Sequence, residues 1–149
     1  MVVMISMKHR SPIRTVLVDG SVECLVRLEK WLGALSDFDI VGKAGSGVEA
    51  LEQWEVFRPD LVIMDAALPL MNGYEVTARM KEKGQGPTVI LMSFFPMGEV
   101  FGKDDCSKAD VVLNKDALYT ELIPTVTRLF SIPPAGQGTH SINESDTMV

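Results

Sequence analysis

Four polar side chains in this sequence follow short apolar runs, and their types suit phosphoryl or metal chemistry. They are two carboxylates, one hydroxyl and one ammonium: Asp19, Asp65, Ser93 and Lys115. Asp65 is the most informative, because it ends the apolar run 61–64 and precedes Pro69 by four positions and Gly73 by eight. A carboxylate at the mouth of a buried strand, with this spacing after it, indicates a phosphate-accepting aspartate.

The elements that must position these side chains are short strands alternating with amphipathic helices. Apolar runs predict five strands, at residues 15–18, 38–41, 61–64, 87–92 and 110–113. Helical spacing predicts five helices, at residues 22–35, 48–54, 74–83, 97–107 and 116–130, with Ser21 as the cap of the first and a glycine-rich turn at 42–47 before the second. Strand 61–64 is apolar throughout, which is typical of a parallel sheet covered on both faces. The pattern therefore predicts a doubly wound α/β fold.

All four polar residues follow the carboxyl ends of predicted strands, namely the first, third, fourth and fifth. In open parallel sheets, ligands bind beyond the carboxyl ends of the strands. Taken singly, each residue has an ordinary explanation, as a helix cap, a turn residue or a solvated surface charge. Together they predict one phosphoryl or metal site, or a relic of one, at this edge of the sheet.

The chain resembles the receiver domain of bacterial two-component response regulators over residues 14–130. The resemblance is carried by Val16-Leu17-Val18-Asp19, by Asp65 with Pro69 and Gly73, by Val89-Ile90-Leu91-Met92-Ser93 and by Lys115. Each motif is modest alone, but the set in this order and at these spacings is specific. The resemblance implies a flavodoxin-like fold in which five helices flank a five-stranded sheet of order 2-1-3-4-5.

The same resemblance implies a signalling role. Asp65 would accept a phosphoryl group from a histidine kinase or phosphotransfer protein, and the chain would relay it as a conformational signal. Mg²⁺ would be held by Asp19, Asp65 and the backbone carbonyl of Ala67. Lys115 would pair with one phosphoryl oxygen, and the hydroxyl of Ser93 would donate a hydrogen bond to another. Any enzymatic activity would be limited to self-phosphorylation and self-dephosphorylation.

Three positions depart from the family pattern. Gly20 stands where a second acidic residue would contact Mg²⁺, so we expect a weak or absent Mg²⁺ site. Phe94 replaces a small residue, and its ring is expected either to cover Asp65 or to point into the core. Val112 stands where the family often carries a Tyr or Phe switch. These departures leave an alternative open, a degenerate pseudo-receiver that acts as a phosphorylation-independent interaction module.

An enzyme or nucleotide binder of similar architecture has less support. A flavodoxin-like cofactor site needs a phosphate-binding loop after the first strand, and residues 19–23 do not form one. A haloacid-dehalogenase-type phosphatase needs a second Asp two positions after the nucleophile, where Ala67 stands.

Composition and charge limit the partners and the location. The 149-residue chain has a net charge of -6 and a pI of about 4.9, which argues against direct binding of nucleic acid. No apolar stretch is long enough to span a membrane, and the first ten residues lack the order of features in a signal peptide. A cytoplasmic protein without membrane attachment is therefore expected.

Three segments are expected along the chain. Residues 1–13 would form a flexible leader, residues 14–130 the receiver domain, and residues 131–149, rich in Pro, Gly and Ser, a disordered tail or linker. The chain would be either a stand-alone receiver or the N-terminal piece of a longer regulator. The resemblance also implies that two copies could pair in a homodimer through the face formed by residues 97–107, 110–113 and 116–130.

Overall fold

The computed structural model describes residues 11–94 and 108–133, and the chain forms two units that are taken separately. The larger unit is Pro12–Leu118, which includes every strand of the sheet. The smaller unit combines Met1–Ser11 with Tyr119–Val149. In the described residues, no helix combines the length and the apolar character needed to cross a membrane.

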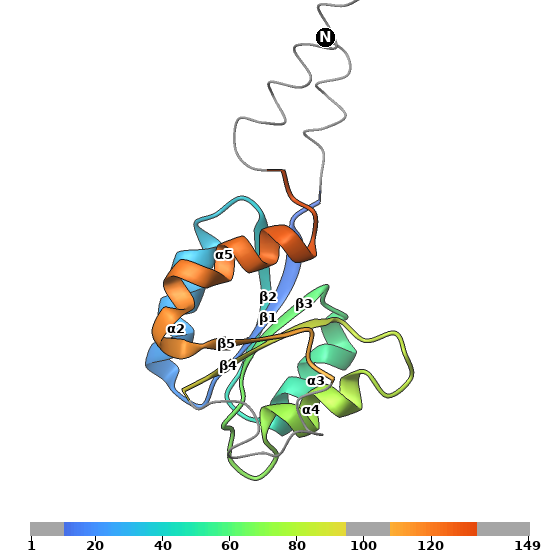
Figure 1. Cartoon of the computed structure of the whole chain (residues 1–149). Coiled ribbons are helices and arrows are strands. Elements are labelled where there is room, and N and C mark those ends of the chain that lie inside the picture. Colours follow the sequence, from blue (N-terminus) through green and yellow to red (C-terminus); the bar gives the residue numbers. More distant parts are fainter. Residues whose placement is uncertain (1–10, 95–107, 134–149) are drawn as a thin grey trace, which may run out of the picture. The chain divides into compact units, whose positions relative to one another are not determined.

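The larger unit is built on a five-stranded parallel sheet (Figure 1). Its strands are β1 (Ile13–Val18), β2 (Phe38–Ala44), β3 (Leu61–Asp65), β4 (Thr88–Ser93) and β5 (Val111–Asn114). Their spatial order is β2-β1-β3-β4-β5, and every neighbouring pair is parallel. The fold class and the strand order expected from the sequence are confirmed.

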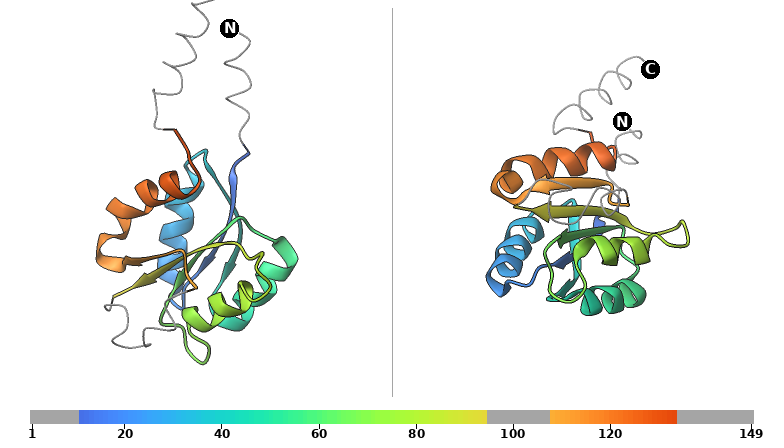
Figure 2. Two further views of the ribbon diagram at one scale, coloured as in Figure 1. Left: turned by 45° about the vertical axis from the view of Figure 1, so that its right-hand side comes forward. Right: turned by 60° about the horizontal axis from the view of Figure 1, so that its bottom comes forward.

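Helices cover both faces of this sheet (Figure 2). On one face, α3 (Gly47–Phe57) and α4 (Gly73–Met80) form a buried cluster with alternate residues of the strands. On the other face lies α2 (Val22–Gly33), which buries Leu28 and Leu32. The first four residues of β3 are fully buried, because a central strand between two helical layers has no solvated face.

β2 is longer than the sequence predicted, and the expected turn at 42–47 is wrong in its first half. Residues 42–44 pair with residues 16–18 of β1, and the chain bends only at residues 45–46. A Cβ atom at Gly42 would lie 2.0 Å from Oε1 of Gln53 in α3. The space left at this glycine is thus filled by side chains of α3, a role that cannot be told from a turn glycine in the sequence.

The helix predicted at 116–130 is divided in two. The 3-10 helix η2 (Lys115–Ala117) comes first, with Asn114 as its cap, and α5 (Leu118–Leu129) follows. Pro124 lies inside α5, and Ser131 takes a left-handed φ of 54° two residues after the helix ends.

Several sequence-based expectations fall outside the described residues. These include the helix at 97–107, most of the leader at 1–13 and most of the tail at 131–149. β1 begins at Ile13, one residue before the domain start expected from the sequence.

Candidate functional site

All four predicted site residues lie at the carboxyl edge of the sheet. Asp65 and Ser93 are the last residues of β3 and β4, and Asp19 and Lys115 are the first residues after β1 and β5. Because the strands are paired in parallel, their carboxyl ends share one edge. Ser93 is buried there, with 6% of its surface exposed.

The ammonium group of Lys115 lies between two carboxylates. Its Nζ atom is 2.8 Å from Oδ2 of Asp19 and 3.3 Å from Oδ2 of Asp65. The side chains of Lys115, Asp19 and Asp65 are 11%, 2% and 15% exposed. Charges so far removed from water require partners. Lys115 is therefore the counter-ion of both acids, a direct contact that the sequence did not predict.

Lys115 stays positively charged throughout the physiological pH range. Burial lowers the pKa of its ammonium, but the hydrogen bond to Asp19 and the charges of Asp65 and Asp19 outweigh burial, so the pKa is raised above its ordinary value of 10.5. The resulting stabilisation is complete below the pKa of an unfolded lysine and is lost as the pH rises past the raised pKa of Lys115.

The second oxygen of each carboxylate is held by a backbone N–H group. Oδ1 of Asp19 accepts a hydrogen bond of 2.8 Å from Ser21, and Oδ1 of Asp65 accepts one of 2.9 Å from Ala67. Ser21 also caps α2 through its side chain, as predicted, by accepting from the backbone N–H of Cys24. Both acids are thus oriented by the start of the loop that follows them. The part that the Ala67 carbonyl would play toward a metal stays a prediction.

Gly73 explains the spacing of eight residues after Asp65. A Cβ atom at Gly73 would lie 2.6 Å from the carbonyl oxygen of Asp65 and 2.9 Å from Cα of Ala66. Just before it, Asn72 starts α4 in a reciprocal capping box with Glu75. The loop after the acid therefore closes back on its own strand through a contact that only glycine allows.

We expect Gly73→Ala to lower the free energy of unfolding by about 2 kcal/mol, because the methyl group meets backbone atoms that cannot rotate away. Gly20→Ala is the matched control, since its Cβ would meet only the carbonyl oxygen of Gly45, at 4.0 Å. That variant should stay within about 0.5 kcal/mol of the parent. Urea denaturation measures both, and equal losses would contradict the role given to Gly73.

The two acids suit a hard divalent cation. Asp19 and Asp65 already converge on one ammonium, so one metal ion can reach both, and Mg²⁺ is commonly held by one or two carboxylates with waters completing its octahedron. Across residues 11–94 and 108–133, no group of three or more His, Cys, Asp or Glu side chains is placed to hold a metal. Gly20 leaves space for a third acid without supplying one. Weak Mg²⁺ binding remains a prediction.

Phe94 is not part of the core. Its surface is 59% exposed, and its ring centroid lies 5.3 Å from Nζ of Lys115. Of the two positions expected for the ring, the inward one is therefore wrong. The contact with Lys115 was missed in the sequence, where these residues are 21 positions apart. Val112, where the family often has an aromatic switch, is partly buried and packs against the core cluster.

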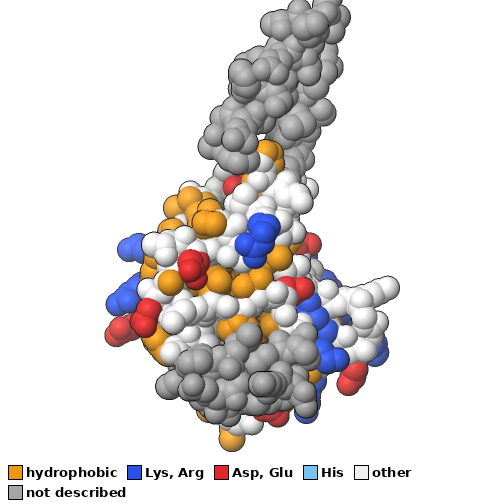
Figure 3. Space-filling view, in the orientation of Figure 1, with side chains coloured by type: hydrophobic (Ala, Val, Ile, Leu, Met, Phe, Trp, Pro, Cys, Tyr) orange, Lys and Arg blue, Asp and Glu red, His pale blue; other side chains and the backbone are white. Residues whose placement is uncertain are grey.

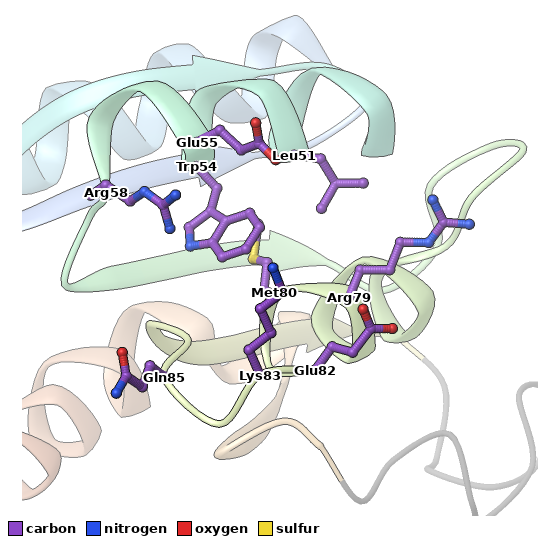
Figure 4. Close-up of a pocket in the computed structure, with 9 residues that line it drawn as sticks. All are labelled: Leu51, Trp54, Glu55, Arg58, Arg79, Met80, Glu82, Lys83 and Gln85. Atoms are coloured by element: carbon purple, nitrogen blue, oxygen red, sulfur yellow. The ribbon is translucent and has the colours of Figure 1, made fainter.

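A cavity of about 650 Å³ lies between α3 and α4, away from these acids (Figure 4). Its lining residues are Leu51, Trp54, Glu55, Arg58, Arg79, Met80, Glu82, Lys83 and Gln85. Both helices end here, and basic and acidic side chains are mixed around the cavity. Arg58 also lies 5.1 Å from the ring centroid of Trp54. None of the predicted site residues lines this cavity.

Basic and acidic side chains are interspersed on the face drawn in Figure 3. In the larger unit, Lys43 pairs with Glu29 at 2.7 Å, and Lys81 pairs with Asp110. Such mixed charge agrees with the expectation of no direct nucleic-acid binding, which stays a prediction.

Most of the chain matches a known protein family. Residues 15–126 match the model of the response regulator receiver domain. The chain belongs to this receiver family. The resemblance seen in the sequence is thereby confirmed.

Two relatives of this receiver domain are regulators of greater length. It is 26% identical to the response regulator protein VraR of Staphylococcus saprophyticus over 121 residues, which are 80% of this chain and 57% of that protein. It is 36% identical to the transcriptional regulatory protein PdtaR of Mycobacterium tuberculosis over 89 residues, 60% of this chain and 43% of that protein. The chain thus spans about half the length of the curated relatives it matches.

Solved receiver domains share the fold. The signal receiver domain of the putative response regulator NarL from Mycobacterium tuberculosis matches 83% of this chain and 100% of its own, with a TM-score of 0.73. At 23% identity, this likeness supports the architecture alone.

Proposed function

We propose that this receiver domain accepts a phosphoryl group on Asp65 from a histidine kinase or phosphotransfer protein and relays it as a conformational signal. The observation that carries the proposal is the ammonium of Lys115 between Asp65 and Asp19. It places a positive charge beside the acid that would receive the phosphoryl group, in a partly water-excluded site where charge neutralisation is most effective.

The transfer itself is a displacement at phosphorus. An oxygen of Asp65 forms a bond to phosphorus while the bond from phosphorus to the imidazole nitrogen of the donor breaks, and the electron pair stays on that nitrogen. The product is an acyl phosphate on Asp65. Mg²⁺, held by Asp19 and Asp65 with the carbonyl of Ala67, would offset negative charge on the phosphoryl oxygens.

The chain's own residues do the positioning. Lys115 would meet one phosphoryl oxygen as a point charge, and Asp19 would hold Lys115 in place when the phosphoryl group arrives. Ser93, buried at the end of the neighbouring strand, would donate its hydroxyl to another oxygen. That pull would displace the segment after β4 and change the surface that partners read.

Membership of the family supports a proposal for the wider role. We propose a cytoplasmic signalling protein in which residues 14–130 form the receiver, preceded by a leader and followed by a tail or linker. Its enzymatic activity would be limited to self-phosphorylation and self-dephosphorylation. A homodimer would use the surface that the family resemblance implies, contributed by residues 97–107, 110–113 and 116–130.

The test is the intact mass after incubation with acetyl phosphate and Mg²⁺. We expect the wild type to gain the mass of one phosphoryl group and Asp65→Asn to gain none, because the variant lacks the nucleophile. Asp39→Asn, which removes an exposed carboxylate on β2, is the control and should behave as the wild type. An adduct that persists in Asp65→Asn would show that the acceptor is elsewhere.

A second candidate is a pseudo-receiver that is read by partners without phosphorylation. Gly20 favours it, because the position next to Asp19 has room for a side chain and carries none. No adduct on the wild type under conditions that modify a Gly20→Asp variant would support this second function.

A further inference from the structure

Phe94 places a large aromatic side chain beside the candidate site. It directly follows Ser93 at the end of β4, and 59% of its surface is exposed. An exposed ring adds little to the core, so its contact with a charged site residue is the feature that sets it apart from the other exposed apolar side chains. Its ring centroid is 5.3 Å from Nζ of Lys115, within the range of a cation–π contact.

We infer that Phe94 is a positioning residue, whose ring holds the ammonium of Lys115 in place between Asp19 and Asp65. A lysine ammonium sits on a flexible four-carbon stem. With only two carboxylates beside it, the ammonium can shift toward either one. The negative face of an aromatic ring attracts the ammonium without taking one of its hydrogen bonds. The ring therefore restrains the ammonium of Lys115, while the N–H groups of the ammonium remain available to oxygen atoms.

The consequence deepens the function proposed for Asp65 and rests on it. A phosphoryl group arriving at Asp65 would find the ammonium already in place, so less reorganisation would be needed during transfer. The competing effect of Phe94 is simple coverage of Asp65. Restraint of Lys115 and coverage of Asp65 make opposite predictions for substitutions of Phe94. Leucine keeps much of the bulk of the ring without its π face, whereas tyrosine keeps both the bulk and the π face.

The contact can be tested without any phosphodonor or metal. In the NMR spectrum of the full chain, the Hε protons of Lys115 should be shifted upfield by the ring current of Phe94. The shift should persist in Phe94→Tyr and disappear in Phe94→Leu. An ordinary Hε shift in the wild type, or an unchanged one in Phe94→Leu, would overturn the inference. Phe94 is exposed, so these variants should fold.

The consequence for chemistry is tested by the rate of adduct formation with acetyl phosphate and Mg²⁺. We expect Phe94→Leu and Phe94→Ala to be about threefold slower than the wild type, the effect of losing a partly exposed cation–π contact, and Phe94→Tyr to be unchanged. Faster modification of Phe94→Ala with an unchanged Phe94→Leu would indicate coverage and overturn the inference. If the wild type forms no adduct, the proposed function fails, and the ring-current result alone decides the role of Phe94.

Discussion

Replacement of Lys115 by methionine is expected to lower the free energy of unfolding by about 3 kcal/mol, the low end for breaking a buried ion pair. Methionine keeps the length of the side chain and removes its charge. Asp19, only 2% exposed, would then face Asp65 without a counter-ion, while Asp65 retains some access to water. Urea denaturation at neutral pH and low salt measures the loss.

Lys43→Met is the matched control for this prediction. Lys43 also pairs with a carboxylate, Glu29, at 2.7 Å, but the two side chains are 44% and 43% exposed. Exposed pairs contribute little, so this variant should lose less than about 1 kcal/mol. Adding Asp19→Asn to Lys115→Met should restore part of the stability, because it removes the unpaired buried charge. Similar losses in the two lysine variants would mean that Lys115 is not the counter-ion of a buried pair.

Gly20→Asp is expected to raise the affinity for Mg²⁺ at least about tenfold, equivalent to about 1.4 kcal/mol. The new carboxylate would join Asp19 and Asp65 around one cation. The site accepts it, since a Cβ at Gly20 meets only a carbonyl oxygen at 4.0 Å, and Gly20 is not among the glycines with positive φ. Calorimetric titration with MgCl₂ measures the affinity of both proteins.

Gly20→Asn isolates the charge from the shape of the new side chain. It should leave the affinity close to that of the wild type, because a neutral amide lacks most of the Coulomb attraction of a carboxylate. In the absence of Mg²⁺, Gly20→Asp should be less stable than Gly20→Asn by about 1 kcal/mol, because a third carboxylate joins two others. Equal Mg²⁺ affinity in the two variants would show that position 20 does not face the metal.

The Gly20→Asp variant also distinguishes between the two functions proposed for the chain. If the wild type is modified on Asp65 as fast as the Gly20→Asp variant, it is a working receiver whose metal site needs only two carboxylates. If the wild type stays unmodified while the Gly20→Asp variant is modified, it is a degenerate receiver that partners recognise without phosphorylation.

The sequence pattern was sufficient to predict the strands and the edge of the sheet where the polar residues gather, and the family resemblance supplied the order of the strands. Apolar runs locate strands because burial on both faces leaves no polar position within them, as in β3. Parallel pairing then places the carboxyl ends of all the strands at one edge, so Asp19, Asp65, Ser93 and Lys115 could be grouped without coordinates. Ser21 was recognisable as a cap because capping is a local interaction.

The tertiary structure alone decided the contacts between residues distant in the chain. Lys115 pairs with Asp19 across 96 positions. Whether its ammonium meets one acid or both depends on the register of four strands, β1, β3, β4 and β5. Gly42 and Gly73 look like turn residues, yet each makes room for atoms that packing brings close, a side chain in one case and backbone in the other. The ring of Phe94 lies over Lys115 because neighbouring strands end side by side, which no local pattern encodes.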